Sequence, residues 1–195
     1  MGRRPVLAVT AVLAILFTVV VLVLDPVRAD DPKPKVSPDP SKAQLQGLQI
    51  PESLRLRHEA FHTEFTKATK ESGKVGDAAR AIEKLGTAHF AKAKDAFPPL
   101  SLLPRLTAGK VTAAEMAEAL KMSEKLMAGL PKIHDEHREL VAGLKRLAEA
   151  AKEEGKMDYV RFAERLTLHI QEEEEVLYPA VLLIGEYLKD AVRKQ

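Results

Sequence analysis

The 195-residue sequence contains no cysteine and no tryptophan, and aromatic residues make up only 5% of it. Without thiolates the chain cannot form disulfides, iron–sulfur clusters, thiolate zinc sites or a c-type haem attachment. Any metal must therefore be held by nitrogen and oxygen atoms. Few aromatic residues, together with abundant Ala, Leu, Glu, Lys and Arg, favour an all-α fold over a sheet.

The sequence also lacks a marked excess of charge of one sign. Its formal net charge is +2, and the N-terminal segment, with Arg3, Arg4 and Arg28 against Asp25, accounts for all of it. With no basic patch in the rest of the chain, we expect no nucleic-acid partner. The length that remains after N-terminal processing suits one domain.

The N-terminal segment has the layout of a secretory signal peptide. Arg3 and Arg4 precede an apolar run over residues 6–24, and Asp25-Pro26 ends that run. We therefore expect residues 1–29 to direct export, which places the domain in the periplasm or outside the cell. The apolar run is nearly long enough to span a bilayer, so an uncleaved membrane anchor is the alternative.

A cleavage site and a linker follow the apolar run. Val27 and Ala29 are small residues at the −3 and −1 positions of a cut after Ala29. Residues 30–49 begin with a segment rich in proline and charge, a composition that stays extended and unpacked. We expect this segment to tether the domain formed by residues 50–195.

Four long amphipathic segments are predicted within that domain. They cover residues 52–71, 77–97, 132–154 and 158–178. Pro98-Pro99 is expected to kink or stop the second segment. Thr112 and Glu115 have the spacing of a capping box, which would start a lead-in helix. Pro131 would kink that helix or restart it as the third segment.

An internal repeat relates the two halves of the domain at an offset of 79 or 80 residues. The matched pairs are Ile50-Pro51 with Leu130-Pro131, His58 with His137, His89 with His169, and Pro99 with Pro179. Short connections within each half make antiparallel neighbours. The prediction is an antiparallel up-down four-helix bundle made of two similar helical hairpins.

Each segment carries one apolar stripe at helical spacing, and each stripe contains one histidine. The stripes are Leu54, His58, Phe61, Phe65 and Ala68; Ile82, Gly86, His89, Ala93, Ala96 and Leu100; Ile133, His137, Leu140, Leu144 and Leu147; and Phe162, Leu166, His169, Glu173, Val176 and Ala180. A single buried histidine is usually structural. Four imidazoles and one carboxylate in a core without a cation would each carry a desolvation cost of about 1–3 kcal/mol. The pattern therefore predicts a metal site.

The segments around these histidines resemble the hemerythrin-like (HHE) family. The resemblance rests on RHEAFHTEF around His58, AHFAKAKDAFPP around His89, HDEHREL around His137 and LHIQEEEEVLYPA around His169. It implies a four-helix bundle with a carboxylate-bridged di-iron centre that binds or senses O2, NO or oxidants. It also implies that the four histidines and Glu173 are the metal ligands.

The sequence departs from the family pattern at Ala93, where the resemblance implies a second bridging Glu. Asp95 lies about 200° around the helix from that position and cannot replace it. The centre could then be asymmetric, mononuclear iron, or occupied by another metal such as zinc. His62, His134 and Glu174 are candidates for additional ligands, with His134 as a partial replacement for the missing carboxylate.

Three classes of function agree with this pattern. The first is a binding or sensing protein whose partners are metal ions and a small diatomic molecule, or a protein that holds iron. The second is an oxidant-handling di-iron enzyme, but no catalytic group is evident beyond the ligands, so we do not expect an enzyme. The third is a mononuclear or metal-free structural bundle. No protein partner can be named from the sequence.

Overall fold

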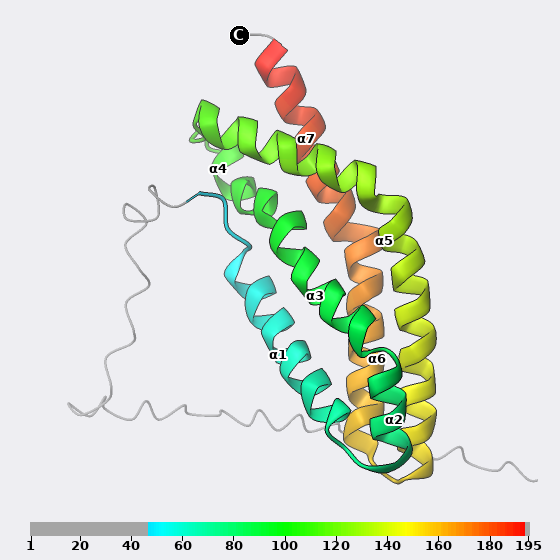
Figure 1. The fold of residues 1–195 in the computed structure, drawn as a ribbon. Helices are drawn as coiled ribbons and strands as arrows, with labels where there is room; N and C mark the ends of the chain where they lie inside the picture. Colours follow the sequence, from blue (N-terminus) through cyan, green and yellow to red (C-terminus); the bar gives the residue numbers. More distant parts are fainter. Residues whose placement is uncertain (1–46, 194–195) are drawn as a thin grey trace, which may run out of the picture. The chain divides into compact units, whose positions relative to one another are not determined.

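A computed structural model of the chain describes residues 47–193 (Figure 1). All the described residues belong to one compact unit of the chain. The predicted signal peptide, and the predicted linker up to residue 46, lie outside the described residues. Among the described residues, no helix is both long and apolar enough to span a membrane.

The described part of the chain is all-helical and contains no strand. Its elements are α1 (Glu52–Thr69), α2 (Gly73–Ala81), α3 (Glu83–Ala96), the 3₁₀ turn η2 (Pro98–Leu102), α4 (Leu103–Leu106), α5 (Ala113–Glu153), α6 (Met157–Glu172), the π turn η3 (Glu173–Leu177) and α7 (Tyr178–Arg193). Helix α1 contacts α2, α3 and α6, and α5 contacts α2, α3, α6 and α7. The predicted all-α class is therefore confirmed.

The second predicted segment is two helices rather than one. It begins at Gly73, four residues before the predicted start, and breaks at Ile82, whose φ of −115° and ψ of 9° end α2 and precede α3. The side chain of Ile82 packs directly against Gly143 of α5. Pro98 ends the segment as predicted, because the chain passes into η2 there.

Helix α5 runs unbroken for 41 residues, with Pro131 inside it. Its start is the predicted capping box: the backbone N–H of Glu115 donates to Thr112 Oγ1, and that of Thr112 donates to Glu115 Oε2. Figure 1 shows that α5 changes direction partway along its length. Proline removes one backbone donor and crowds the preceding turn, so a bend without a restart is its expected effect.

The fourth predicted stripe is buried as far as Glu173, and beyond it the inward-facing positions move by one residue along the chain. The backbone N–H of Tyr178 donates to the carbonyl of Glu173, an i to i+5 bond that widens the turn. Val176, predicted to face inward, is consequently 56% exposed, while Tyr178 and Val181 are buried in its place. The prediction for Val176 was wrong because it assumed an uninterrupted α-helical period.

Two apolar clusters form the core, and the predicted histidine positions lie between them along α1, α3, α5 and α6. One cluster includes Phe65, Leu144 and Phe162, and the other includes Leu54, Phe97 and Val181. Every member of the two stripes predicted for the first and second segments is buried. The third stripe is buried apart from the half-buried Ile133.

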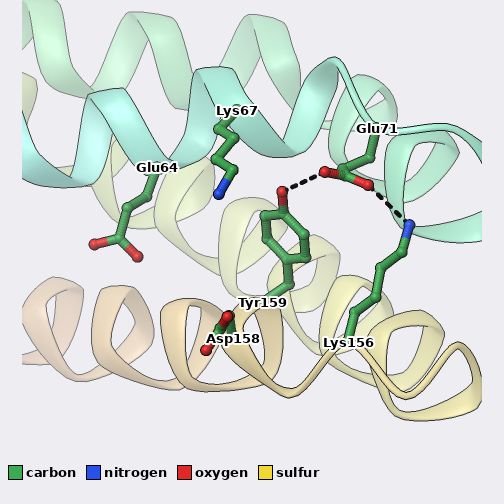
Figure 2. A pocket seen from close by; sticks show the side chains of 6 residues that line it. All are labelled: Glu64, Lys67, Glu71, Lys156, Asp158 and Tyr159. Carbon is green, nitrogen blue, oxygen red and sulfur yellow. Dashed lines mark hydrogen bonds and ion pairs between the residues drawn. The ribbon is translucent and has the colours of Figure 1, made fainter.

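A polar network closes one end of the helices, where the α1–α2 connection meets the α5–α6 connection. Tyr159 Oη donates to Glu71 Oε1 over 2.7 Å, and Lys156 Nζ donates to Glu71 Oε2 over 2.9 Å. Figure 2 shows both side chains converging on Glu71 at the edge of a surface pocket. No histidine lines this pocket, so we interpret the network as structural. It holds the α1–α2 and α5–α6 connections together.

The close approach of Ile82 to Gly143 predicts a strong effect of a single methyl group. A Cβ at Gly143 would lie 2.1 Å from Ile82 Cγ2, so either the side chain or the helix must move. We expect Gly143→Ala to lower the free energy of unfolding by about 1–3 kcal/mol, although alanine is the better helix former. Urea denaturation followed by circular dichroism measures this.

Gly129, in the same helix, is the matched control. Its Cβ would meet only Ile133 Cδ1, at 3.8 Å, so Gly129→Ala should leave stability unchanged or raise it by up to about 1 kcal/mol. In an Ile82→Ala background the cost of Gly143→Ala should disappear. Equal effects of the two glycine substitutions in the wild-type background would contradict the close packing.

Candidate metal centre

Five side chains predicted as metal ligands meet in one buried layer. His58 comes from α1, His89 from α3, His137 from α5, His169 from α6, and Glu173 is the first residue of the π turn η3. The four imidazoles are only 3–8% exposed and Glu173 is 0% exposed. The helical stripes thus bring these residues together as the spacing predicts.

The Glu173 carboxylate lies at the centre of this layer, and its two oxygens face different imidazoles. Oε1 is 3.1 Å from His58 Nε2, 3.3 Å from His169 Nε2 and 3.8 Å from His89 Nε2. Oε2 is 3.5 Å from His137 Nε2. Histidines from four helices therefore share one carboxylate.

Two further carboxylates hold the outer nitrogens of two of these imidazoles. His137 Nδ1–H donates to Glu174 Oε1 over 2.9 Å, and His169 Nδ1–H donates to Glu172 Oε2 over 3.4 Å. Arg57 in turn forms an ion pair with Glu172. Glu174, a candidate additional ligand, thus binds the far side of His137 and orients it. This role of Glu172 was not predicted from the sequence, because Glu172 lies off the inward stripe of its helix.

These outer bonds determine which nitrogen of each ring carries the proton in the neutral form. With Nδ1–H donating outward, Nε2 of His137 and of His169 presents a lone pair to the layer. Neighbouring imidazoles meet these lone pairs: His89 Nδ1 lies 3.2 Å from His137 Nε2, and His58 Nε2 lies 2.6 Å from His169 Nε2. A carboxylate has only acceptor atoms, so neither lone pair can bond to Glu173, although its oxygens lie only 3.3–3.5 Å away. A metal ion would bind both lone pairs and the carboxylate together.

Two buried ring nitrogens in the layer have no hydrogen-bond partner within the described residues. They are His58 Nδ1 and His89 Nε2. In addition, His58 Nε2 and His169 Nε2 lie only 2.6 Å apart, closer than the usual ~2.9 Å for a hydrogen bond from nitrogen. An unpaired buried polar atom costs about 1–3 kcal/mol, and metal coordination would satisfy such an atom.

The surroundings of these groups lower the pKa of both His89 and Glu173, which favours the neutral form of the histidine and the ionised form of the glutamate. Burial, together with the neighbouring imidazoles, lowers the pKa of His89 to about 4 despite the opposing charge of Glu173. Burial by itself would raise the pKa of Glu173, but the imidazoles beside it, chiefly those of His169 and His58, outweigh burial and hold that pKa far below its usual range. The layer therefore favours an ionised Glu173 beside a neutral His89, which are the forms that bind metals.

Aromatic rings surround the layer. The ring of Phe61 lies 5.2 Å from that of His169, Phe90 lies 5.2 Å from His89, and Phe97 lies 5.8 Å from His58. These rings limit the access of water, which strengthens electrostatic interactions inside the layer.

Tyr178 completes the layer from the far side of the π turn. Its Oη donates to Glu173 Oε2 over 3.1 Å, and its ring stacks on Phe97 and on His137. Burial and the negative charge of Glu173 raise the pKa of Tyr178 well above its usual range, so the hydroxyl keeps its proton. The sequence did not predict this contact, because an uninterrupted α-helix would have pointed Tyr178 elsewhere.

The remaining candidate ligands stay outside the layer. His62 is exposed and packs edge-on against Phe90. His134 is half-buried, and it makes no hydrogen bond or ring contact among those found in the described part of the chain. Asp95 pairs with Lys125 over 2.6 Å and is turned away from the layer, as its helical position predicts.

The residues present fit a metal ion. Ligand atoms of His58, His89 and Glu173 all lie within 4.8 Å of one another. Around an ion with bonds of ~2.1 Å, ligand atoms stand ~3–3.4 Å apart, close to the nitrogen–oxygen distances of 3.1–3.8 Å measured to Glu173. Imidazole and carboxylate suit iron and zinc alike.

Comparisons of the chain with protein-family models, with curated proteins and with solved structures found no match.

The outer bond from His137 to Glu174 generates a prediction about metal affinity. We expect Glu174→Ala to weaken the binding of Zn²⁺ by about 10–100-fold, because His137 loses the partner that orients its ring. Glu175→Ala is the control, since Glu175 is exposed and has no hydrogen bond among those found. Competition with a chromophoric chelator measures both variants. Equal affinities would show that Glu174 has no orienting role.

Proposed function

We propose that this protein is a non-haem metal-binding protein of the hemerythrin-like type, with iron held inside a four-helix bundle. The bundle would consist of α1, α2 with α3, the C-terminal part of α5, and α6. Its ligands would be His58, His89, His137, His169 and Glu173, as the resemblance in sequence implies.

One observation carries this proposal. Four imidazoles converge on one fully buried carboxylate, and the buried Nε2 of His89 has no hydrogen-bond partner within the described residues. Added protons could balance the charge of the carboxylate, but each imidazolium would place a positive charge in an apolar core, which burial opposes. A metal cation would balance the charge of Glu173 and bind the free nitrogen of His89 as well.

The two oxygens of Glu173 support a pair of metal ions. A carboxylate with imidazoles at both oxygens has the arrangement of a bridging ligand. A single metal ion held by His58, His89 and Glu173 is the second candidate. Ala93 favours it, because a methyl group stands where a second carboxylate ligand would be expected, and the described residues place no other carboxylate inside the layer. Metal stoichiometry distinguishes the two candidates.

When bound, iron would supply the redox chemistry and the open coordination position through which such proteins bind or sense O2, NO or oxidants. The chain's own residues would set the conditions for that chemistry. Phe61, Phe90 and Phe97 border the layer with apolar rings, and Tyr178 holds a proton on its Oη beside Glu173. We propose a role in binding, sensing or holding iron rather than catalysis.

The metal content of the full chain, purified without a histidine tag, tests this function. We expect about two irons per chain for a bridged pair and about one for the mononuclear form, by elemental analysis after aerobic purification. His58→Gln should lose the metal, because it removes a buried ligand. His62→Gln, one helical turn away on the same face but exposed, should keep it.

Two further results bear on the ligand set. Glu173→Gln should also lose the metal, since the amide carries no charge and binds cations poorly. His134→Ala should leave stoichiometry and optical spectrum unchanged if His134 lies outside the site. A wild-type chain that stays metal-free after reconstitution with Fe²⁺ and Zn²⁺ would refute the proposal and leave a structural bundle.

We also propose that the domain works outside the cytoplasm, on the basis of Arg3, Arg4, the apolar run 6–24 and the cleavage pattern at Ala29. Fractionation of cells that express the full chain, followed by N-terminal sequencing, should find the protein exported and beginning at Asp30. A membrane-bound chain that begins at the N-terminus would identify the segment as an anchor instead. Full-length protein in the cytoplasm would disprove export.

A further inference from the structure

The internal repeat shows that one position matching a carboxylate ligand carries no carboxylate. At an offset of 80 residues, His89 and Ala93 on α3 match His169 and Glu173 on α6 and η3. His169 Nε2 lies 3.3 Å from Glu173 Oε1, one helical turn along the chain. His89 has only the methyl group of Ala93 at the same spacing, and Ala93 is 4% exposed.

The nitrogen of His89 shows the consequence of this difference. His89 Nε2 is buried and has no hydrogen-bond partner within the described residues. The Glu173 carboxylate is 3.8 Å away, which is too far for a hydrogen bond. Helices α1 and α3 therefore contribute no carboxylate to the layer, whereas Glu173 comes from the turn directly after α6.

A cavity reaches this deficient side from the surface. It has a volume of about 560 Å³ between α1 and α3, and its lining includes Ala93 and His58. That volume far exceeds the ~30 Å³ of one water molecule. The cavity is bordered by His58, whose buried Nδ1 has no hydrogen-bond partner within the described residues, so it ends at the edge of the layer.

The charged residues around the cavity favour an anion. Its lining includes Arg55, His62 and Lys94 against one acid, Glu59. Arg55 is paired with Glu52 and with Glu59. Lys94 forms no ion pair among those found in the described residues and is exposed. Its uncompensated charge would attract a small anion toward the opening.

We propose that the cavity binds a small free carboxylate of the size of formate or acetate, which completes the metal's ligand set beside Ala93. The atoms by which glutamate exceeds alanine are a methylene and a carboxylate, the same atoms that make up acetate. The inference rests on the proposed metal site, because the metal would be the main anchor of the anion. It makes the protein a receptor whose metal affinity depends on a carboxylate.

Metal affinity measured at increasing acetate concentration tests this inference. The full chain is titrated with Co²⁺ against a chelator, with acetate replacing chloride at constant ionic strength, and the visible spectrum is recorded. Acetate that binds only the metal-loaded protein should lower the dissociation constant for Co²⁺ roughly tenfold, once the acetate concentration reaches about ten times its own dissociation constant. The spectrum should change in parallel, because a new ligand joins the metal. Phosphate in place of acetate should have no effect.

Three variants separate a specific carboxylate site from a general salt effect. Ala93→Glu supplies the missing group and should bind Co²⁺ tightly without responding to acetate. Ala93→Leu fills the inner end of the cavity and should abolish the response without tightening the binding. Ala117→Glu adds the same charge at an exposed residue of α5 that does not line the cavity, and it should behave like the wild type.

Each outcome has one interpretation. Wild-type protein that binds Co²⁺ with an affinity independent of acetate would overturn the carboxylate site and leave the metal site intact. A response to phosphate equal to that to acetate would overturn the assignment to carboxylates. No Co²⁺ binding under any condition would refute the proposed function itself. The wild-type titration decides the question even if a variant fails to fold, which circular dichroism reveals.

Discussion

The buried carboxylate of Glu173 is the group on which the rest of this structure depends. Removing an ionised carboxylate from water costs several kcal/mol unless partners replace its hydration. Here His58 Nε2 and the hydroxyl of Tyr178 hydrogen-bond to the carboxylate, and imidazoles from three further helices lie within 3.8 Å of it. A rotation of any one helix would move one of these side chains away from the charge, so the layer fixes the rotational register of the helices around it.

The polar layer is stable only because of what surrounds it. Apolar clusters lie on both sides of it along the helices, and phenylalanine rings border it laterally. Low polarity strengthens each interaction inside the layer and raises the cost of each unsatisfied atom. Glu172 and Glu174 extend the network outward on the α5–α6 side, where their carboxylates orient two imidazoles. Of these three successive glutamates, Glu173 lies in the layer and the other two orient its imidazoles.

The two halves of the domain, which the internal repeat relates, differ in the groups that they contribute to the layer. The half containing α5 and α6 provides the central carboxylate, both outer carboxylates and the tyrosine hydroxyl. The half containing α1 and α3 provides two imidazoles with unpartnered nitrogens and a cavity that opens to the surface. One side would therefore hold a cation and fix its ligands, and the other side is accessible to a small molecule. This asymmetry would suit the proposed binding protein, since a ligand could enter without disturbing the residues that would hold the metal.

The sequence by itself determined the helical class, the inward position of the four histidines and Glu173, and the end of α3 at Pro98. These features follow from a period of 3.6 residues and from the chemistry of proline, which act within a few residues along the chain. Only the tertiary structure decided the break at Ile82, the π turn after Glu172, and the outer roles of Glu172 and Glu174. An i to i+5 bond differs locally very little from an i to i+4 bond. The stacking of Tyr178 on Phe97 and His137 supports the wide turn, and such contacts join residues that are distant in sequence.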